Sequence, residues 1–217
     1  GQYIDSKSEK FNTIYDPSTG KAIAQVPCCT KDEVEAAIAA AKAAYPAWKN
    51  TPVRKRAAIM MKLHSLIERD MDELTRLVAT ENGKCWAEAA GDVGKALDMT
   101  ELACSGPTML MGDSLMDTSA GYDTTLYREP LGVFAGIAPW NFPAMIPVGW
   151  MAPLAIVCGN TFVLKPASTT PMTCMKFAEL YKEAGIPDGV FNIVPCSRGE
   201  AEILLTHPDV RGITFVG

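Results

Sequence analysis

The hydrophobic positions in the second half of the chain form short unbroken runs separated by longer segments. Residues 132–138 are such a run, rich in Val, Phe and Ile, and it stops at Pro139, which is typical of a buried strand in a parallel sheet. Residues 161–164 form the next run, which Lys165-Pro166 closes. The apolar segment between the runs stops at Gly159-Asn160, a pair that ends helices because either residue adopts the left-handed backbone. This order predicts a βαβ unit.

The same alternation continues to residue 217. It predicts a helix from Thr170-Pro171 to Gly185, a strand at 190–194, a short helix at 199–206 and a last strand at 212–216. Four strands separated by three helices predict an α/β fold with a doubly wound parallel, Rossmann-like sheet. Ligands bind such sheets outside the carboxyl ends of the strands, where Asn141 and Lys165 fall.

Helical spacing dominates residues 30–105. A capping box at Thr30–Glu33 begins a helix whose apolar stripe runs from Val34 to Trp48. A second helix begins at Thr51-Pro52, and Asp70 with Glu73 caps a third that ends at Asn82-Gly83. A fourth helix covers residues 84–105 and ends at Gly106-Pro107.

Two hairpins complete the predicted architecture. The pattern of residues 1–29 predicts extended segments around a turn at residues 16–20. We expect this hairpin to lie on the domain surface. Residues 112–129 are polar and alternate weakly, with a turn at Gly121. We interpret them as a hairpin that leaves the body of the domain and offers free strand edges. The fold predicted is therefore a set of N-terminal helices, a protruding β-hairpin and a Rossmann-like sheet.

Composition excludes several classes of protein. The net charge of −5 argues against a nucleic-acid partner, and the basic cluster Arg54–Arg56 is interpreted as a solvated helix face. No apolar run lasts the roughly 18 residues of a membrane span, and we expect neither a membrane segment nor a secretory leader. Seven cysteines without framework spacing and only two histidines predict reduced, mostly buried thiols, no metal site and a cytoplasmic protein.

Two polar residues are candidates for chemistry. The Asn141 amide can donate a hydrogen bond to a developing oxyanion, which lowers a reaction barrier by about 2.7–4 kcal/mol. The alternative is an asparagine that satisfies the backbone of its own turn. Lys165 precedes a proline and is held extended, although an isolated lysine at a strand end is commonly just solvated. Trp140 taken alone fits core packing. The residues by themselves do not decide between a functional and a purely structural role.

The segments PWNFP, residues 139–143, and GNTFVLKP, residues 159–166, resemble the aldehyde dehydrogenase superfamily in order and separation. The resemblance runs from residue 15 to residue 217. It implies a dehydrogenase that uses NAD or NADP and acts on a small aldehyde through a cysteine thioester. In the family the nucleophilic cysteine and the general-base glutamate lie further along the chain. The sequence therefore looks like the N-terminal portion of an enzyme, and we expect it to be inactive by itself.

The resemblance also divides the chain. Residues 1–112 match the helical part of the cofactor-binding domain, residues 113–130 the oligomerisation hairpin and residues 131–217 the Rossmann-like part that binds NAD(P). The family's hairpin takes part in subunit association, so the resemblance implies a homo-oligomer, a dimer or tetramer. An exposed arm without a partner is the alternative. No cysteine of this chain is interpreted as the nucleophile.

Site roles follow residue by residue from the resemblance. The matching asparagine, Asn141, stabilises the oxyanion formed when cysteine attacks the aldehyde, and the matching lysine, Lys165, binds the adenosine ribose of the cofactor. Many members that prefer NAD have glutamate where this chain has Ser168, which predicts relaxed NAD/NADP choice. The remaining cofactor-binding residues implied are Ala138, Pro139, Trp140, Thr169 and Gly217, the last in a loop before a pyrophosphate helix.

Within the superfamily the chain most resembles the methylmalonate-semialdehyde (malonate-semialdehyde) dehydrogenase group, which transfers the acyl group to coenzyme A. This resemblance is carried by residues 111–115, by the short segment between Val194 and His207, and by residues 215–217. Lys95 stands where the group has an arginine associated with the substrate carboxylate, and the segment between Pro143 and Pro153 is one residue longer. Trp140 and Ser168 instead resemble hydrolytic succinate-semialdehyde enzymes. A non-catalytic nucleotide-binding or association module is the alternative from another class.

Overall fold

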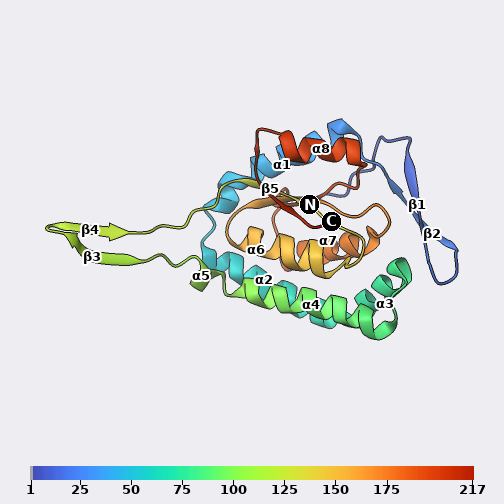
Figure 1. Ribbon diagram of the computed structural model, residues 1–217, viewed down its shortest axis with the longest axis horizontal. Helices are drawn as coiled ribbons and strands as arrows, with labels where there is room; N and C mark the ends of the chain where they lie inside the picture. The colour runs from blue at the N-terminus through green and yellow to red at the C-terminus, as the bar shows by residue number, and fades with distance from the viewer. Residues whose placement is uncertain (1) are drawn as a thin grey trace.

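A four-stranded parallel sheet lies at the centre of the molecule, which is described here by a computed structural model covering residues 2–217 (Figure 1). The strand order is β7-β6-β5-β8, so the first strand of the predicted βαβ unit lies inside the sheet. The strands are β5 (Val133–Ile137), β6 (Thr161–Lys165), β7 (Phe191–Ile193) and β8 (Val210–Phe215). The predicted parallel α/β sheet is confirmed.

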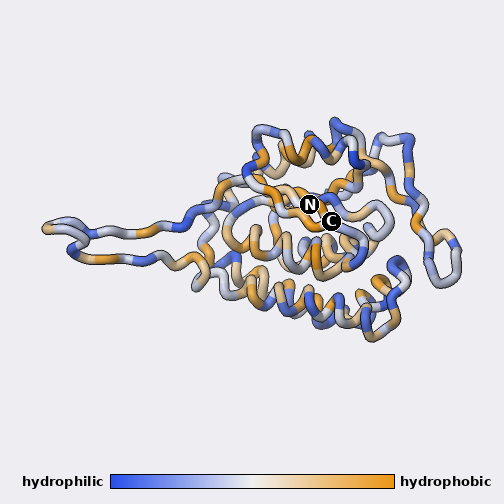
Figure 2. The backbone as a smooth tube through the Cα atoms, in the orientation of Figure 1, coloured by the Kyte–Doolittle hydropathy of each residue, from blue (hydrophilic) through white to orange (hydrophobic). Residues whose placement is uncertain are grey.

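Helices cover both faces of this sheet, as a doubly wound fold requires (Figure 1). One face carries α1 and α8, and the other carries α6 and α7, behind which α2 and α4 form an outer layer. Hydrophobic residues concentrate in the strands and in the helices around them (Figure 2). The helices are α1 (Lys31–Lys49), α2 (Val53–Arg69), α3 (Met71–Asn82), α4 (Trp86–Cys104), α6 (Ala152–Val157), α7 (Met172–Ala184) and α8 (Arg198–Thr206).

The helix ends confirm some predicted caps and correct others. Thr30 and Glu33 form the predicted capping box of α1, and Gly83 ends α3 with a left-handed φ of 79°. The predicted Asp70 cap of α3 is wrong, because its carboxylate accepts hydrogen bonds from the Arg69 guanidinium instead. The fourth predicted helix ends just before Gly106, as α4, and Gly106 then begins the short helix α5 (Gly106–Met109).

Arg56 corrects the interpretation of residues 54–56 as a solvated face. Its side chain is buried at 5% relative exposure, and Nε donates to the carbonyl oxygen of Val157 at 2.8 Å. Its Nη1 donates to the backbone carbonyls of Lys49 and Thr51. Arg54 is exposed as predicted. The buried guanidinium therefore joins the end of α1 and the start of α2 to the end of α6.

The apolar segment between Pro143 and Gly159 is not a single α-helix. It begins as a π-helix, η1 (Met145–Met151), in which the Gly149 N–H donates to the Ala144 carbonyl five residues earlier at 3.1 Å. The α-helix α6 follows and ends at Val157, two residues before Gly159, whose φ is 97°. A π turn holds more residues than an α turn, so the chain is wound more widely in η1 than in α6.

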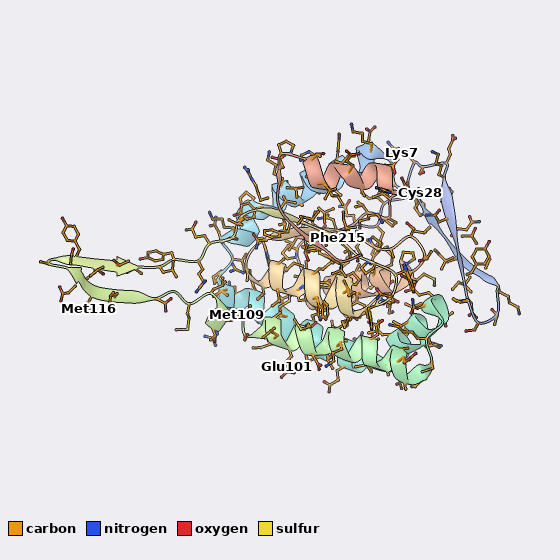
Figure 3. The ribbon with its side chains drawn as sticks, in the orientation of Figure 1. Lys7, Cys28, Glu101, Met109, Met116 and Phe215 are labelled. Carbon is orange, nitrogen blue, oxygen red and sulfur yellow. The ribbon has the colours of Figure 1, made fainter. Side chains whose placement is uncertain are left out.

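Two antiparallel hairpins are separate from the central sheet. The first, β1 (Phe11–Tyr15) with β2 (Ala22–Pro27), turns at residues 16–20 as predicted. The second, β3 (Ser114–Ser119) with β4 (Tyr122–Thr125), is a projecting arm, all of whose strand residues are exposed (Figure 1). Met109 lies at the base of the arm and Met116 toward its tip (Figure 3). The division into three domains stays a prediction.

Candidate functional site at the carboxyl edge of the sheet

The carboxyl ends of three strands meet at one edge of the sheet. Ile137 is the register partner of both Lys165 on β6 and Phe215 on β8. Beyond that pairing, the Ala138 N–H donates to the Lys165 carbonyl at 3.1 Å, and the Val216 N–H donates to the Ile137 carbonyl at 3.2 Å. Backbone pairing thus brings the residues that follow β5, β6 and β8 together where parallel sheets bind ligands.

The structure places the predicted cofactor residues after these strand ends. Ala138 is buried, Pro139 is half-buried, and Trp140 leaves 63% of its surface exposed, so the core-packing interpretation of Trp140 is wrong. Lys165 is half-buried, and its ammonium donates to the Pro166 carbonyl at 3.1 Å. Ser168 is half-exposed and Thr169 is exposed in the loop after β6, and Gly217 is exposed after β8.

Asn141 occupies the loop between β5 and η1 and is exposed. The carbonyl oxygen of the preceding residue, Trp140, accepts hydrogen bonds from Asn82 Nδ2 at 2.8 Å and from Thr170 Oγ1 at 3.4 Å. Groups from α3 and from the segment just before α7 therefore hold the backbone of the loop next to Asn141.

A buried ion pair lies behind the loop. Asp92 of α4 is 1% exposed, accepts a hydrogen bond from the Met145 N–H at 2.7 Å and pairs with Lys84 Nζ at 3.0 Å. Burial raises the pKa of Asp92, although the Met145 amide and the Lys84 ammonium favour its charged form. The Lys84 ammonium also lies 3.9 Å from the centre of the Phe142 ring.

A second buried carboxylate, Glu81, holds the start of α7. Its Oε2 accepts from the Met172 N–H at 2.8 Å, and its Oε1 accepts from the Thr173 N–H at 2.8 Å and from the Thr173 hydroxyl. Burial raises the pKa of Glu81 to about 7 against these three donors. A carboxylate suits this position because it meets free amides at the positive end of the helix dipole.

The sequence analysis missed both buried carboxylates. Glu81 follows Leu74 and Val78 on the buried stripe of α3, and Asp92 lies beside Val93 on the buried stripe of α4. An acidic residue on an otherwise apolar helical face was the available signal, because a buried charge requires partners.

Lys95 is not part of the constellation around Asn141. Its side chain is exposed on α4 and pairs with Asp98 Oδ2 at 2.9 Å. Among the interactions of the described residues, none joins Lys95 to the loop or to the sheet edge. Its predicted contact with a substrate carboxylate stays a prediction.

Most of the thiols occupy environments that suppress the thiolate. Burial raises the pKa of Cys29 to about 11 and that of Cys196 to about 12, and it also raises the pKa values of Cys104, Cys158 and Cys174. A thiol is nucleophilic as the thiolate, so these five are poor candidates for covalent catalysis. Within residues 2–217, His, Cys, Asp and Glu side chains form no group of three or more suited to a metal ion.

The arrangement of the chain matches a known family over almost its whole length. Residues 3–217 match the profile of the Aldehyde dehydrogenase family. The chain belongs to that family.

Relatives of this aldehyde dehydrogenase chain include semialdehyde enzymes. It is 48% identical to malonate-semialdehyde dehydrogenase 2 of Geobacillus kaustophilus and 47% identical to malonate-semialdehyde dehydrogenase 1 of Geobacillus thermodenitrificans, in each case over the whole chain and 45% of the relative. The chain thus spans under half the length of these relatives.

Solved structures of the family share the fold. The methylmalonate-semialdehyde dehydrogenase of Oceanimonas doudoroffii superposes with a TM-score of 0.94 at 38% identity, over 97% of this chain and 43% of that one. A protein from Sinorhizobium meliloti 1021, solved in complex with NAD, superposes with a TM-score of 0.96 at 36% identity, over 100% of this chain and 44% of that one. The family fold predicted from the sequence is confirmed.

The groups at the sheet edge fit a nicotinamide dinucleotide. The ammonium of Lys165 lies at the end of β6, and the hydroxyls of Ser168 and Thr169 follow in the next loop. These groups can donate hydrogen bonds to a ribose diol or a phosphate, and the exposed ring of Trp140 offers an apolar surface beside them. The donor set is therefore consistent with the nucleotide that members of this family use.

The described helices include none that combines the length and apolarity needed to cross a bilayer.

Proposed function

We propose that the protein carrying this chain oxidises a small semialdehyde with NAD or NADP, through a cysteine thioester. The observation that carries the proposal is that the Asn141 loop and Lys165 meet at one edge of the sheet. Membership of the aldehyde dehydrogenase family and similarity to malonate-semialdehyde dehydrogenases support it.

The cofactor is assigned to the carboxyl edge of the sheet. Lys165 would hold the adenosine ribose, with Ser168 and Thr169 beside it and Ala138, Pro139 and Trp140 along the path toward the nicotinamide. Gly217 would lie near the pyrophosphate. NAD or NADP supplies the acceptor for the hydride that leaves the substrate. The position of the half-buried Lys165 at the end of β6 supports this assignment, since lysine binds phosphate oxygens as a point charge.

Asn141 is assigned the role of oxyanion donor. An aldehyde carbonyl that is attacked by a thiolate develops a negative charge on oxygen, and a fixed amide N–H stabilises this charge more than it stabilises the ground state. The exposed position of Asn141 on a loop anchored at Trp140 supports the role. The attacking cysteine is assigned to the portion of the relatives that this chain does not span.

Coenzyme A is the acyl acceptor that we propose, with a malonate or methylmalonate semialdehyde as the substrate. Similarity to the Geobacillus and Oceanimonas enzymes supports the substrate class. Lys95 would supply a positive charge for the substrate carboxylate, as a point charge rather than a bidentate fork. Release of the thioester by water, as in a succinate-semialdehyde enzyme, is the competing proposal.

Ser168 supports relaxed cofactor choice. Serine carries no charge to repel a 2′-phosphate and offers only one hydroxyl to a ribose diol. We therefore propose use of both NAD and NADP.

The projecting arm supports self-association into a dimer or tetramer. Its strands expose backbone edges together with Leu115, Met116 and Tyr122, which proteins usually cover. A location in the cytoplasm stays a prediction.

An assay of the full-length protein with malonate, methylmalonate and succinate semialdehydes tests the proposal. Reduction of NAD or NADP is followed with and without coenzyme A, and acyl-coenzyme A and free acid are quantified. We expect turnover with the two malonate-type substrates and a coenzyme A thioester as the product. Formation of free acid at the same rate without coenzyme A would favour release of the thioester by water. Absence of turnover with dinucleotide binding intact would leave a non-catalytic nucleotide-binding module.

A further inference from the structure

The backbone beside Asn141 is fixed by a side chain from another helix. The Trp140 carbonyl, which immediately precedes Asn141, accepts a hydrogen bond from Asn82 Nδ2 at 2.8 Å. Asn82 is the last residue of α3 and lies 58 positions away in sequence. A contact between such distant segments is imposed by the tertiary structure, so the loop conformation depends on α3 being in place.

The other side of Asn141 is held by the same segment of chain. Lys84 Nζ lies 3.9 Å from the centre of the Phe142 ring and pairs with Asp92 Oδ2 at 3.0 Å. The other oxygen of Asp92 accepts from the Met145 N–H at 2.7 Å. The Lys84 side chain is only 15% exposed and the Asp92 side chain is fully buried, so both charges are sheltered from solvent and held in place by each other.

The segment that carries both contacts is itself anchored. Glu81 binds the first amides of α7, and Gly83 ends α3 by donating its N–H to the Ala79 carbonyl at 2.9 Å. A side chain built at Gly83 would approach the Pro17 ring to 3.2 Å, so the turn of the β1–β2 hairpin packs over this point. Residues 81–84 therefore form a fixed corner, which we call the α3 corner.

We propose that Asn82 and Lys84, at the α3 corner, are positioning residues that hold the Asn141 amide at the point where the oxyanion develops. The inference rests on the proposed function, because it assigns the corner a role in the same reaction. Neither residue is assigned contact with the substrate. They act by holding the residues on the two sides of Asn141, which fixes the backbone from which its amide extends.

The test measures kcat, KM and NAD(P) affinity of the full-length protein with Asn82→Ala, Asn141→Ala and the double variant. A misplacement of 1 Å costs up to about 100-fold in rate, so we expect Asn82→Ala to lower kcat by about 10- to 100-fold. Cofactor affinity and KM should change little. The matched control is Asn50→Ala, which removes an exposed asparagine at the end of α1 and should leave kcat unchanged.

The double variant separates positioning from a general structural effect. If Asn82 acts through Asn141, adding Asn82→Ala to Asn141→Ala should lower kcat by less than about twofold, because coupled residues are not additive. An equal loss of rate in both backgrounds would overturn the proposal. If Asn141→Ala itself keeps the full rate, the proposed function fails at this site. If Asn141→Ala is slow and Asn82→Ala is as fast as the native protein, only the positioning role fails.

Variants of Lys84 provide a second, independent test. Lys84→Arg keeps a cation for Asp92 and for the Phe142 ring and should retain most of the rate, whereas Lys84→Met should lose it. Circular dichroism and thermal unfolding identify variants that have not folded. Should Lys84→Met fail to fold, the Asn82 series decides the proposal. Equal activity of folded Lys84→Met and Lys84→Arg would contradict it.

Discussion

The Ala138 N–H donates to the carbonyl oxygen of Lys165 at 3.1 Å, one step beyond the last register pair of β5 and β6. This bond extends the parallel ladder past the strands and sets the start of the Asn141 loop beside the lysine. Two residues that lie 27 positions apart in sequence are thereby held at one edge by the backbone rather than by side chains. Substitutions of side chains next to Ala138 and Lys165 should therefore change the reaction rate or cofactor binding more readily than they change this backbone contact.

Arg56 should be the most costly of the three basic residues at 54–56 to replace. Arg56→Met leaves the carbonyls of Val157, Lys49 and Thr51 without their donor, and buried acceptors that lose a partner cost about 1–3 kcal/mol each. We expect a loss of about 3 kcal/mol in the free energy of unfolding, measured in urea. Exposed Arg54→Met is the control and should stay within about 0.5 kcal/mol. Equal effects of both variants would contradict the buried role of Arg56.

Glu81 should make the protein less stable as the pH rises toward neutrality. Its pKa is raised from 4.5 to about 7, so the folded state holds a proton that the unfolded state releases between these values. This contribution is complete below pH 4.5 and is lost as the pH rises through 7. At about 1.4 kcal/mol for each pKa unit, it amounts to about 3 kcal/mol.

Glu81→Gln isolates this contribution, since an amide does not titrate. Unfolding of both proteins at pH 5 and pH 8 gives the difference in stability at each pH. We expect the native protein to lose about 2–3 kcal/mol more than the variant between these pH values. A difference between the two proteins that is independent of pH would show that Glu81 does not titrate in this range.

Gly149 and Gly91 should respond oppositely to alanine. A methyl group at Gly149 in the π-helix would lie 2.8 Å from Ala96 Cα, whereas one at Gly91 on α4 meets no atom within 4 Å. Gly149→Ala should cost about 1–3 kcal/mol through overpacking. Gly91→Ala should stabilise by up to about 1 kcal/mol through helix propensity. Thermal unfolding measures both, and a stable Gly149→Ala would contradict the close approach of η1 to α4.

The α/β architecture could be predicted because its signals are local. Unbroken apolar runs, glycines at helix ends and the Thr30–Glu33 box each act over a few residues, and the structure follows them. The π-helix could not be predicted, since a segment that is apolar on every side has no periodicity from which to read its pitch.

The surroundings of the site were harder to predict than the site itself. Asn141 and Lys165 are marked by a family resemblance and by their positions after strands. Each of Arg56, Glu81 and Asp92 has a partner that lies 53 to 101 residues away in sequence, so their burial depends on tertiary packing. The sequence predicts an exposed Arg56 because its neighbours Arg54 and Lys55 are charged. On a helix, however, one of three adjacent positions can face the core.

Ser168 should control the choice between NAD and NADP. In the full-length protein, Ser168→Glu adds a carboxylate that accepts hydrogen bonds from a ribose diol and repels a 2′-phosphate. We expect the ratio of the NADP Kd to the NAD Kd to rise by about tenfold or more, equivalent to about 1.4 kcal/mol. Ser119→Glu on the exposed arm is the matched control. An unchanged ratio would place the 2′-position away from Ser168.

The rate of hydride transfer in the full-length protein with and without the Asn141 amide tests the central claim most directly. Asn141→Ala should bind NAD or NADP as tightly as the native protein and reduce it about 100- to 1000-fold more slowly on mixing with semialdehyde, as loss of an oxyanion donor does. A native rate in Asn141→Ala would contradict the assignment of this loop to aldehyde oxidation.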